Sequence, residues 1–279
     1  MISTPLVRKA AIRRHYDLAT VFYRLLWGPH IHHGLWDADE LPAVATRRLI
    51  DLLAREARVG PGTRLLDVGC GMGGSAVYLA RHLGCDSTGL TLSPVQRAWA
   101  ATAARWHGVG RRVRVLCRDA EAARFRAGTF DVVWSVECTE HLFDKPAFFQ
   151  KAARWLRPGG RVAICAWLAG DEPHSPAAVR LVRDVCDGFL CPSLGTAREY
   201  TDWLEDAGLQ IRLAADLTER VSRTWEICLD RVRRSRVGVL ARLVDRDQEQ
   251  FLQHFATILE AYRTGAMKYG CFVAASGRA

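Results

Sequence analysis

The chain has 279 residues, of which 49% are hydrophobic and 25% are charged, a composition that excludes a disordered polypeptide. Its net charge of +9 comes almost entirely from arginines scattered along the chain, and without an RNA-binding signature this charge does not indicate a nucleic-acid partner. Nine cysteines without CxxC spacing predict free thiols in a reducing compartment. No signal-peptide-like or membrane-spanning apolar run is present, so we expect a cytoplasmic protein without integral membrane association.

The N-terminal part of the chain has a helical pattern. Apolar residues at helical spacing predict helices over residues 5–26 and 41–58, joined by a loop rich in histidine and aromatic residues, WGPHIHHGLWD. A Gly-Pro-Gly turn follows, and the pattern then changes. We therefore expect residues 1–60 to form an N-terminal helical cap on a domain made by residues 61–279.

After this turn, short apolar strands alternate with helices. Strands are expected over residues 64–68, 85–90, 113–117, 130–136, 161–167, 209–214 and 269–275, with helices over 73–83, 94–107, 145–156 and 198–207. Such alternation predicts an α/β fold with a doubly wound, mostly parallel, seven-stranded sheet. Two segments interrupt it, near residues 171–195 and 222–262, and both are expected to be helical lid insertions over a substrate.

The clearest functional motif is a glycine loop, LLDVGCGMGG, at residues 65–74. An apolar strand runs into glycines that open a helix, so bare backbone can approach a ligand and the helix N-terminus presents unpaired amides to it. Gly69, Gly71 and Gly74 also match the dinucleotide-binding pattern. A dinucleotide-dependent oxidoreductase is therefore an alternative interpretation.

Three features favour another nucleoside cofactor over NAD. Asp67, two residues before the first glycine, would repel a pyrophosphate but suits an amino group or a ribose. The acidic residue expected at the end of the second strand is absent, since Asp86 stands at the start of that strand. Finally, a long helical segment precedes the loop, whereas a dinucleotide loop commonly opens its domain.

Five motifs occur in the order and spacing of class I S-adenosylmethionine-dependent methyltransferases, which the chain resembles. They are LLDVGCGMGG, TGLTLSPVQ at 88–96, RDA at 118–120, FDVVWSVECTEHL at 130–142 and LRPGG at 156–160. The TLS..Q stretch and HYDLATVFYRLLWGPHIHHGLWD are similar to the group containing tocopherol and sterol C-methyltransferases and other small-molecule methyltransferases. The resemblance implies a Rossmann-like methyltransferase fold and S-adenosylmethionine as cofactor, with S-adenosylhomocysteine as product.

The resemblance also implies which residues contact the cofactor. The glycines and Asp67 belong to this set, and further members are expected at the ribose, the adenine and the methionine end. The full set is Tyr16, Asp67, Gly69, Gly71, Thr91, Leu92, Gln96, Asp119, Ala120 and Ser135. A sulfonium cation favours aromatic faces, and the candidates to supply them are Tyr16, Trp27, Trp36 and Trp134.

Four residues are candidate catalytic groups. Glu137, Glu140 and His141 follow a sheet strand at its carboxyl edge, where ligands bind in such folds; a helix-start carboxylate or a packed histidine is the alternative for each. His33 is a candidate because the resembling family uses its HIHHG loop as part of the active-site cap. The closely spaced His30, His32 and His33 have no obvious fourth ligand, so no metal is expected.

These features predict methyl transfer to a carbon or nitrogen of a small, largely apolar acceptor, which would be aromatic, indolic or prenyl-like and belong to specialised metabolism. O-Methylation of a phenolic small molecule is a further alternative. The apolar residues of the second insertion support an apolar acceptor, and no oligomeric state is indicated.

Overall fold

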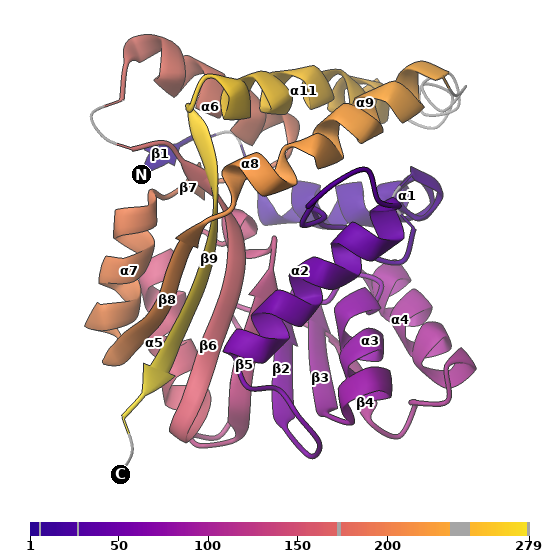
Figure 1. Ribbon diagram of the computed structural model, residues 1–279, viewed down its shortest axis with the longest axis vertical. Helices are drawn as coiled ribbons and strands as arrows, with labels where there is room; N and C mark the ends of the chain where they lie inside the picture. Colours follow the sequence, from indigo (N-terminus) through magenta and orange to yellow (C-terminus); the bar gives the residue numbers. More distant parts are fainter. Residues whose placement is uncertain (6, 27, 172–173, 235–245, 278–279) are drawn as a thin grey trace.

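The computed structural model describes residues 1–5, 7–26, 28–171, 174–234 and 246–277. Its centre is a seven-stranded sheet with the order β4-β3-β2-β5-β6-β9-β8 (Figure 1). The strands are β2 (Arg64–Val68), β3 (Asp86–Thr91), β4 (Val113–Cys117), β5 (Phe130–Val136), β6 (Leu156–Ala169), β8 (Leu209–Asp216) and β9 (Met267–Ser276). Only β9 runs antiparallel to its neighbours, β6 and β8. The predicted mostly parallel, seven-stranded α/β sheet is confirmed.

Helices cover both faces of this sheet. Neighbouring strand residues point to opposite faces, so Leu65 joins one buried apolar cluster and Leu66 another. The first cluster includes Leu49 of α2 and the second includes Phe148 of α5. The covering helices are α2 (Pro42–Glu56), α3 (Gly74–Leu83), α4 (Pro94–Trp106), α5 (Lys145–Trp155) and α7 (Ala197–Asp206).

The remaining helices lie across the end of the sheet to which the parallel strands point (Figure 1). They are α1 (Lys9–Leu26), α6 (Pro176–Gly188), α8 (Thr218–Val221), α9 (Arg223–Arg234) and α11 (Arg246–Arg263). The first of these belongs to the predicted cap, and the others belong to, or directly precede, the predicted insertions. Trp27, residues 172–173 and residues 235–245 lie outside the described residues. None of the described helices combines the length and the apolarity needed to cross a membrane.

A small second sheet was not expected from the sequence. Residues Ile2–Ser3 (β1) pair antiparallel with Ser193–Leu194 (β7), which joins the N-terminus to the first insertion. The first helix accordingly begins at Lys9 rather than at residue 5. The strand β6 is also longer than the seven residues predicted: it begins at Leu156, which pairs with Phe130 of β5, and its antiparallel pairing with β9 extends to Ala169.

Candidate active site

Three adjoining cavities lie at the carboxyl edge of the sheet. The glycine-loop cavity, about 570 Å³, is lined by Gly69, Gly71 and residues between β3 and α4. The Asp67 cavity, about 340 Å³, lies between the same glycines and residues 29–32 of the cap loop. The aromatic cavity, about 520 Å³, lies beyond them under the cap and α9. Ile31 lines all three, so they adjoin at this residue.

The glycine loop has a backbone that side chains rarely permit. Gly69 and Gly71 have φ values of +77° and +51°, in the left-handed region that favours glycine. A Cβ at Gly69 would lie 2.3 Å from Sγ of Cys138, whereas a Cβ at Gly71 would meet no atom within 4 Å. Gly71 lines two of the cavities, so its missing side chain leaves room for a ligand against the backbone.

Two buried polar groups beside this loop have no hydrogen-bond partner among the described residues: Oδ2 of Asp67 and Nε2 of Gln96. Burial raises the pKa of Asp67 to about 7. The amide of Gln96 is oriented by Thr91, whose hydroxyl donates to its Oε1 at 2.9 Å, so Nε2 remains available to donate. Since orphaned buried groups are costly, the site suits a ligand with a cationic group near Asp67 and an oxygen near Gln96.

Seven of the ten predicted cofactor residues line these cavities. Asp67 lines the Asp67 cavity, and the glycine-loop cavity is lined by Tyr16, Gly69, Gly71, Thr91, Leu92 and Gln96. Asp119, Ala120 and Ser135 are not among the residues that line the three cavities; the carboxylate of Asp119 accepts from Lys9 of α1 at 2.6 Å.

The other aromatic candidates differ from Tyr16. Trp134 is fully buried within the core cluster on the α2 face, and Trp36 donates its indole N–H to Thr224 at 2.9 Å. Neither is among the residues that line the three cavities. Packing with neighbouring elements therefore accounts for both side chains.

The aromatic cavity contains all four candidate catalytic residues. Its apolar lining includes five rings, those of Tyr16, Tyr23, Trp167, Phe189 and Trp225. Its polar lining includes His33, Glu137, Glu140 and His141. Since Tyr16, Ile31, Glu137 and His141 also line the glycine-loop cavity, a group held there and a molecule in the aromatic cavity would meet at these four residues.

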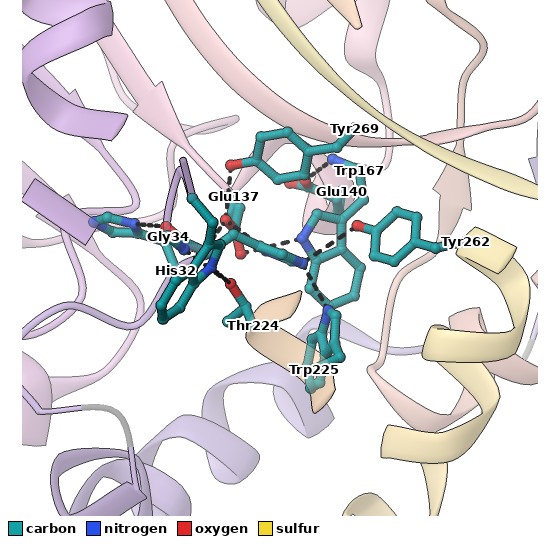
Figure 2. A network of polar contacts seen from close by, with 11 residues as sticks. His32, Gly34, Glu137, Glu140, Trp167, Thr224, Trp225, Tyr262 and Tyr269 are labelled. Carbon is teal, nitrogen blue, oxygen red and sulfur yellow. Dashed lines mark hydrogen bonds and ion pairs between the residues drawn. The ribbon is translucent and has the colours of Figure 1, made fainter. Parts of the chain in front are cut away.

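Glu137 is the centre of the polar network shown in Figure 2. Its Oε1 accepts from the backbone N–H of His33 at 2.7 Å and from the hydroxyl of Tyr269 at 2.8 Å, and its Oε2 accepts from the indole of Trp167 at 3.1 Å. Burial by itself raises the pKa of Glu137, but its electrostatic interaction and hydrogen bonds with His33 more than offset this, so the pKa lies below its ordinary value. Glu137 is thus a carboxylate whose oxygens are already occupied.

His33 bridges this carboxylate and α9. Its Nδ1 lies 2.9 Å from Oε1 of Glu137, and its Nε2 accepts from the indole N–H of Trp225 at 2.6 Å. Because an indole only donates, Nε2 carries no proton and Nδ1–H faces Glu137. The rings of Tyr262 and Tyr269 also lie close, with centroids 5.8 and 4.9 Å away. These contacts orient the imidazole and leave it without a free lone pair.

His141 forms a pair with Tyr16 of α1. Its Nδ1 lies 3.0 Å from the carbonyl oxygen of Leu190, which can only accept, so Nδ1 carries the proton. The Nε2 lone pair therefore accepts from the Tyr16 hydroxyl at 2.8 Å. Burial lowers the pKa of His141 to about 4, so the imidazole is neutral at neutral pH.

Ile31 and His32 of the cap loop are among the lining residues that the sequence did not single out as site residues. Ile31 lines all three cavities, and His32 lines two of them. Nδ1 of His32 lies 2.8 Å from the His33 carbonyl oxygen, and its Nε2 has no partner among the described residues. The HIHHG motif was the available signal, but its spacing does not distinguish one histidine from another. Within the described parts of the chain, no three His, Cys, Asp or Glu side chains gather as metal ligands.

Comparison with known proteins identifies the family. Residues 5–270 match the family model described as mycolic acid cyclopropane synthetase. The chain is 31% identical to tocopherol O-methyltransferase of Arabidopsis thaliana, over 96% of this chain and 82% of that protein. It is 33% identical to 27-O-demethylrifamycin SV methyltransferase of Amycolatopsis mediterranei, over 89% and 92%.

Solved structures agree with this assignment. The fold superposes on the [4+2]-cyclase SpnF with a TM-score of 0.87 over 99% of both chains, at 24% identity, a likeness of fold alone. Geranyl diphosphate methyltransferase in complex with SAM is 25% identical, with a TM-score of 0.69 over 88% of this chain and 98% of that chain. The chain belongs to the mycolic acid cyclopropane synthetase family and is an S-adenosylmethionine-dependent methyltransferase.

Proposed function

We propose that the chain transfers a methyl group to a carbon or nitrogen of a small, largely apolar acceptor that is aromatic, indolic or prenyl-like. One observation carries this proposal: a cavity lined by five aromatic rings adjoins the glycine-loop cavity through four shared residues. Such a lining favours an apolar molecule with few polar groups. Bound S-adenosylmethionine would supply a methyl group activated by a positively charged sulfur.

The cofactor side of the site is proposed from the orphaned groups described above. The Asp67 carboxylate would hold a cationic amino group, Gln96 would donate to a ribose oxygen, and Gly71 would leave the backbone open to close approach. The three predicted residues outside the cavities, Asp119, Ala120 and Ser135, remain proposals that rest on the resemblance.

The acceptor side is proposed to be assembled by the cap and the two insertions. The aromatic cavity is lined by Ile31 of the cap loop, by Phe189 after α6 and by Trp225 of α9, which come from residues 1–60, 171–195 and 222–262. This supports the division into a helical cap and a Rossmann-like domain, residues 61–279, with lid insertions. Enclosure by three segments excludes water, and this favours transfer to the acceptor over side reactions.

Tyr16 and His141 are proposed to remove a proton where the acceptor atom carries one. The proton would pass to the Tyr16 oxygen while the Tyr16 hydroxyl proton passes to Nε2 of His141, along the existing 2.8 Å contact. The electron pair left on the acceptor atom would be the nucleophile for the methyl group. The Nε2 lone pair of His33 is occupied by Trp225, and each carboxylate oxygen of Glu137 already accepts at least one hydrogen bond, so we assign them a positioning role.

O-Methylation of a phenol is the second candidate function. The printed names of two relatives, tocopherol O-methyltransferase and 27-O-demethylrifamycin SV methyltransferase, favour it. A phenolic proton is much more acidic than a pyrrolic one, so the Tyr16–His141 pair would remove it more readily.

A panel of phenolic, indolic and prenyl acceptors, incubated with methyl-labelled S-adenosylmethionine, tests both candidates. We expect label in at least one product, and mass spectrometric fragmentation then gives the methylated atom. No turnover across the panel would contradict the proposed acceptor class. Replacement of His141 by Gln is expected to lower kcat by roughly 100-fold with a proton-bearing acceptor and to leave the affinity for S-adenosylhomocysteine within about threefold.

A further inference from the structure

Glu140 lines the aromatic cavity, and only one of its two oxygens takes part in the network of Figure 2. Glu140 is 2% exposed, and its Oε1 accepts from the backbone N–H of Trp167. Its second oxygen, Oε2, is buried and has no hydrogen-bond partner among the described residues. A buried carboxyl oxygen without a hydrogen-bond partner is energetically unfavourable, so its retention in a cavity wall needs an explanation.

The surroundings of Glu140 favour the neutral acid over the carboxylate. It belongs to the short 3₁₀ helix Thr139–His141 after β5. Burial is the largest influence and raises the pKa of Glu140 to about 8; Glu137 adds to this rise, whereas the Trp167 amide and Lys145 oppose it. At neutral pH the carboxyl therefore keeps its proton. A neutral carboxyl whose Oε1 already accepts a hydrogen bond presents an O–H donor at Oε2.

The other ionisable groups around Glu140 leave this proton in place. The neighbouring hydroxyls and thiols are buried, and burial raises the pKa of each above its ordinary value, so all stay neutral: they are Tyr16, Tyr200, Tyr262, Cys138, Cys165 and Cys191. Lys145 of α5 is the nearest cation, but its Nζ donates at 2.9 Å to the Leu142 carbonyl and at 2.8 Å to the hydroxyl of Ser193. No ion pair between Lys145 and Glu140 is formed among the described residues, so the acid has no cation to ionise against.

We infer that Glu140 is a hydrogen-bond donor to an oxygen atom of the acceptor, so the acceptor class is narrowed to apolar ring compounds that carry a carbonyl, quinone or ether oxygen. This inference rests on the proposed function of the aromatic cavity. Within that cavity the aromatic rings favour an apolar acceptor, and the hydrogen bond from Glu140 determines where the oxygen atom of the acceptor lies. A hydrocarbon of the same shape leaves the buried donor unsatisfied and is rejected for that reason.

The inference is tested with two probes of nearly equal shape, 1-tetralone and tetralin, which differ by one carbonyl oxygen. Calorimetry in the presence of S-adenosylhomocysteine measures the dissociation constant of each. For the unaltered protein at pH 6.5, where Glu140 is protonated, we expect the ketone to bind about tenfold more tightly than the hydrocarbon. At pH 9.5 the carboxyl has lost its proton, and the preference is expected to disappear.

Glu140→Gln provides the matched variant. The glutamine side chain accepts from Trp167 with its oxygen and presents an N–H donor that does not titrate. The variant is expected to keep the preference for the ketone at both pH values. Glu205→Gln, an exposed change on α7, is the control and should reproduce the pH dependence of the unaltered protein.

Each other outcome overturns the inference. If the unaltered protein still prefers the ketone at pH 9.5, the hydrogen-bond donor is a group other than Glu140. If the two probes bind equally at pH 6.5, or if neither binds, Glu140 does not donate to the acceptor. Its failure differs from failure of the proposed function. Turnover of the acceptor panel without a ketone preference would support the proposed methyl transfer and contradict the role of Glu140. A ketone preference without turnover would support the role of Glu140 and contradict the proposed acceptor class.

Discussion

The buried carboxyl of Asp67 is unfavourable in the free protein for the same reason that it suits a cationic ligand. Its pKa is about 7 in the folded chain and about 3.9 in an unfolded one. The folded state therefore holds the proton more tightly, and stability falls as pH rises from roughly 4 to 7 and then levels off.

Asp67→Asn should remove this fall in stability, because the amide stays neutral. We expect the free energy of unfolding of the variant, relative to that of the unaltered protein, to rise by on the order of 1–3 kcal/mol from pH 5 to pH 8. Its affinity for S-adenosylhomocysteine is expected to fall. Denaturant unfolding at both pH values measures the first effect, and calorimetry measures the second. Asp202→Asn, an exposed change on α7, is the control and should alter neither stability nor affinity. If the stability difference between Asp67→Asn and the unaltered protein does not grow with pH, the pKa of Asp67 is not raised.

Gly71→Val tests whether the open space at the glycine loop belongs to a ligand. The new side chain would enter the cavity, since a Cβ there meets no protein atom, and we expect the affinity for S-adenosylhomocysteine to fall at least about 100-fold. The left-handed backbone also costs roughly 1–2 kcal/mol of stability. Gly108→Val, with φ +73° and equally open surroundings, carries the same strain away from the cavities. Comparable loss of binding in both variants would mean that strain, not blocked approach, is responsible.

At the scale of elements, the strands and most helices could be predicted because apolar periodicity and glycine turns are local signals. The pairing of β1 with β7 could not, since two-residue strands have no periodicity and their register depends on a partner about 190 residues away. For the site, the sequence predicted that Glu137, Glu140 and His141 lie together, because they follow a strand at the carboxyl edge of the sheet. Which of them has a free lone pair depends on donors from other elements, such as Trp225 of α9, and no local pattern contains that information.

The helix α1 is held over the glycine-loop cavity by polar contacts at its start. Lys9 donates to Asp119 at 2.6 Å and to Glu121 at 2.8 Å, and the helix carries Ile12 and Tyr16 into the cavity wall. Lys9→Met should change stability by less than about 1 kcal/mol, because these ion pairs are partly exposed, yet it should weaken S-adenosylhomocysteine binding severalfold. The ion pair of Arg112 with Asp86 lies away from the cavities, so Arg112→Met should leave binding unchanged. Equal affinities in the two variants would contradict a tethering role for Lys9.

At the scale of the whole molecule, the aromatic cavity closes where distant parts of the chain meet. Thr224 at the start of α9 accepts from the Gly34 amide at 3.0 Å and from the indole of Trp36 at 2.9 Å, and the adjacent Trp225 donates to His33. These contacts join the cap loop to α9, whereas no residue of α9 is among those that line the glycine-loop and Asp67 cavities. Acceptor binding should therefore depend on this junction more than cofactor binding does.

Thr224→Val is expected to distinguish acceptor binding from cofactor binding. Valine has nearly the same shape but cannot accept, so two buried donors lose their partner, each at a cost of about 1–3 kcal/mol. We expect faster amide hydrogen exchange in residues 28–41 and in α9, and a higher KM for the acceptor, with S-adenosylhomocysteine affinity within about threefold. Thr201→Val on α7, whose hydroxyl donates to the Arg198 carbonyl, is the control. If amide exchange also becomes faster throughout the sheet, Thr224 stabilises the whole fold. If exchange becomes faster only in the two joined segments, the aromatic cavity opens locally while the glycine-loop and Asp67 cavities stay formed.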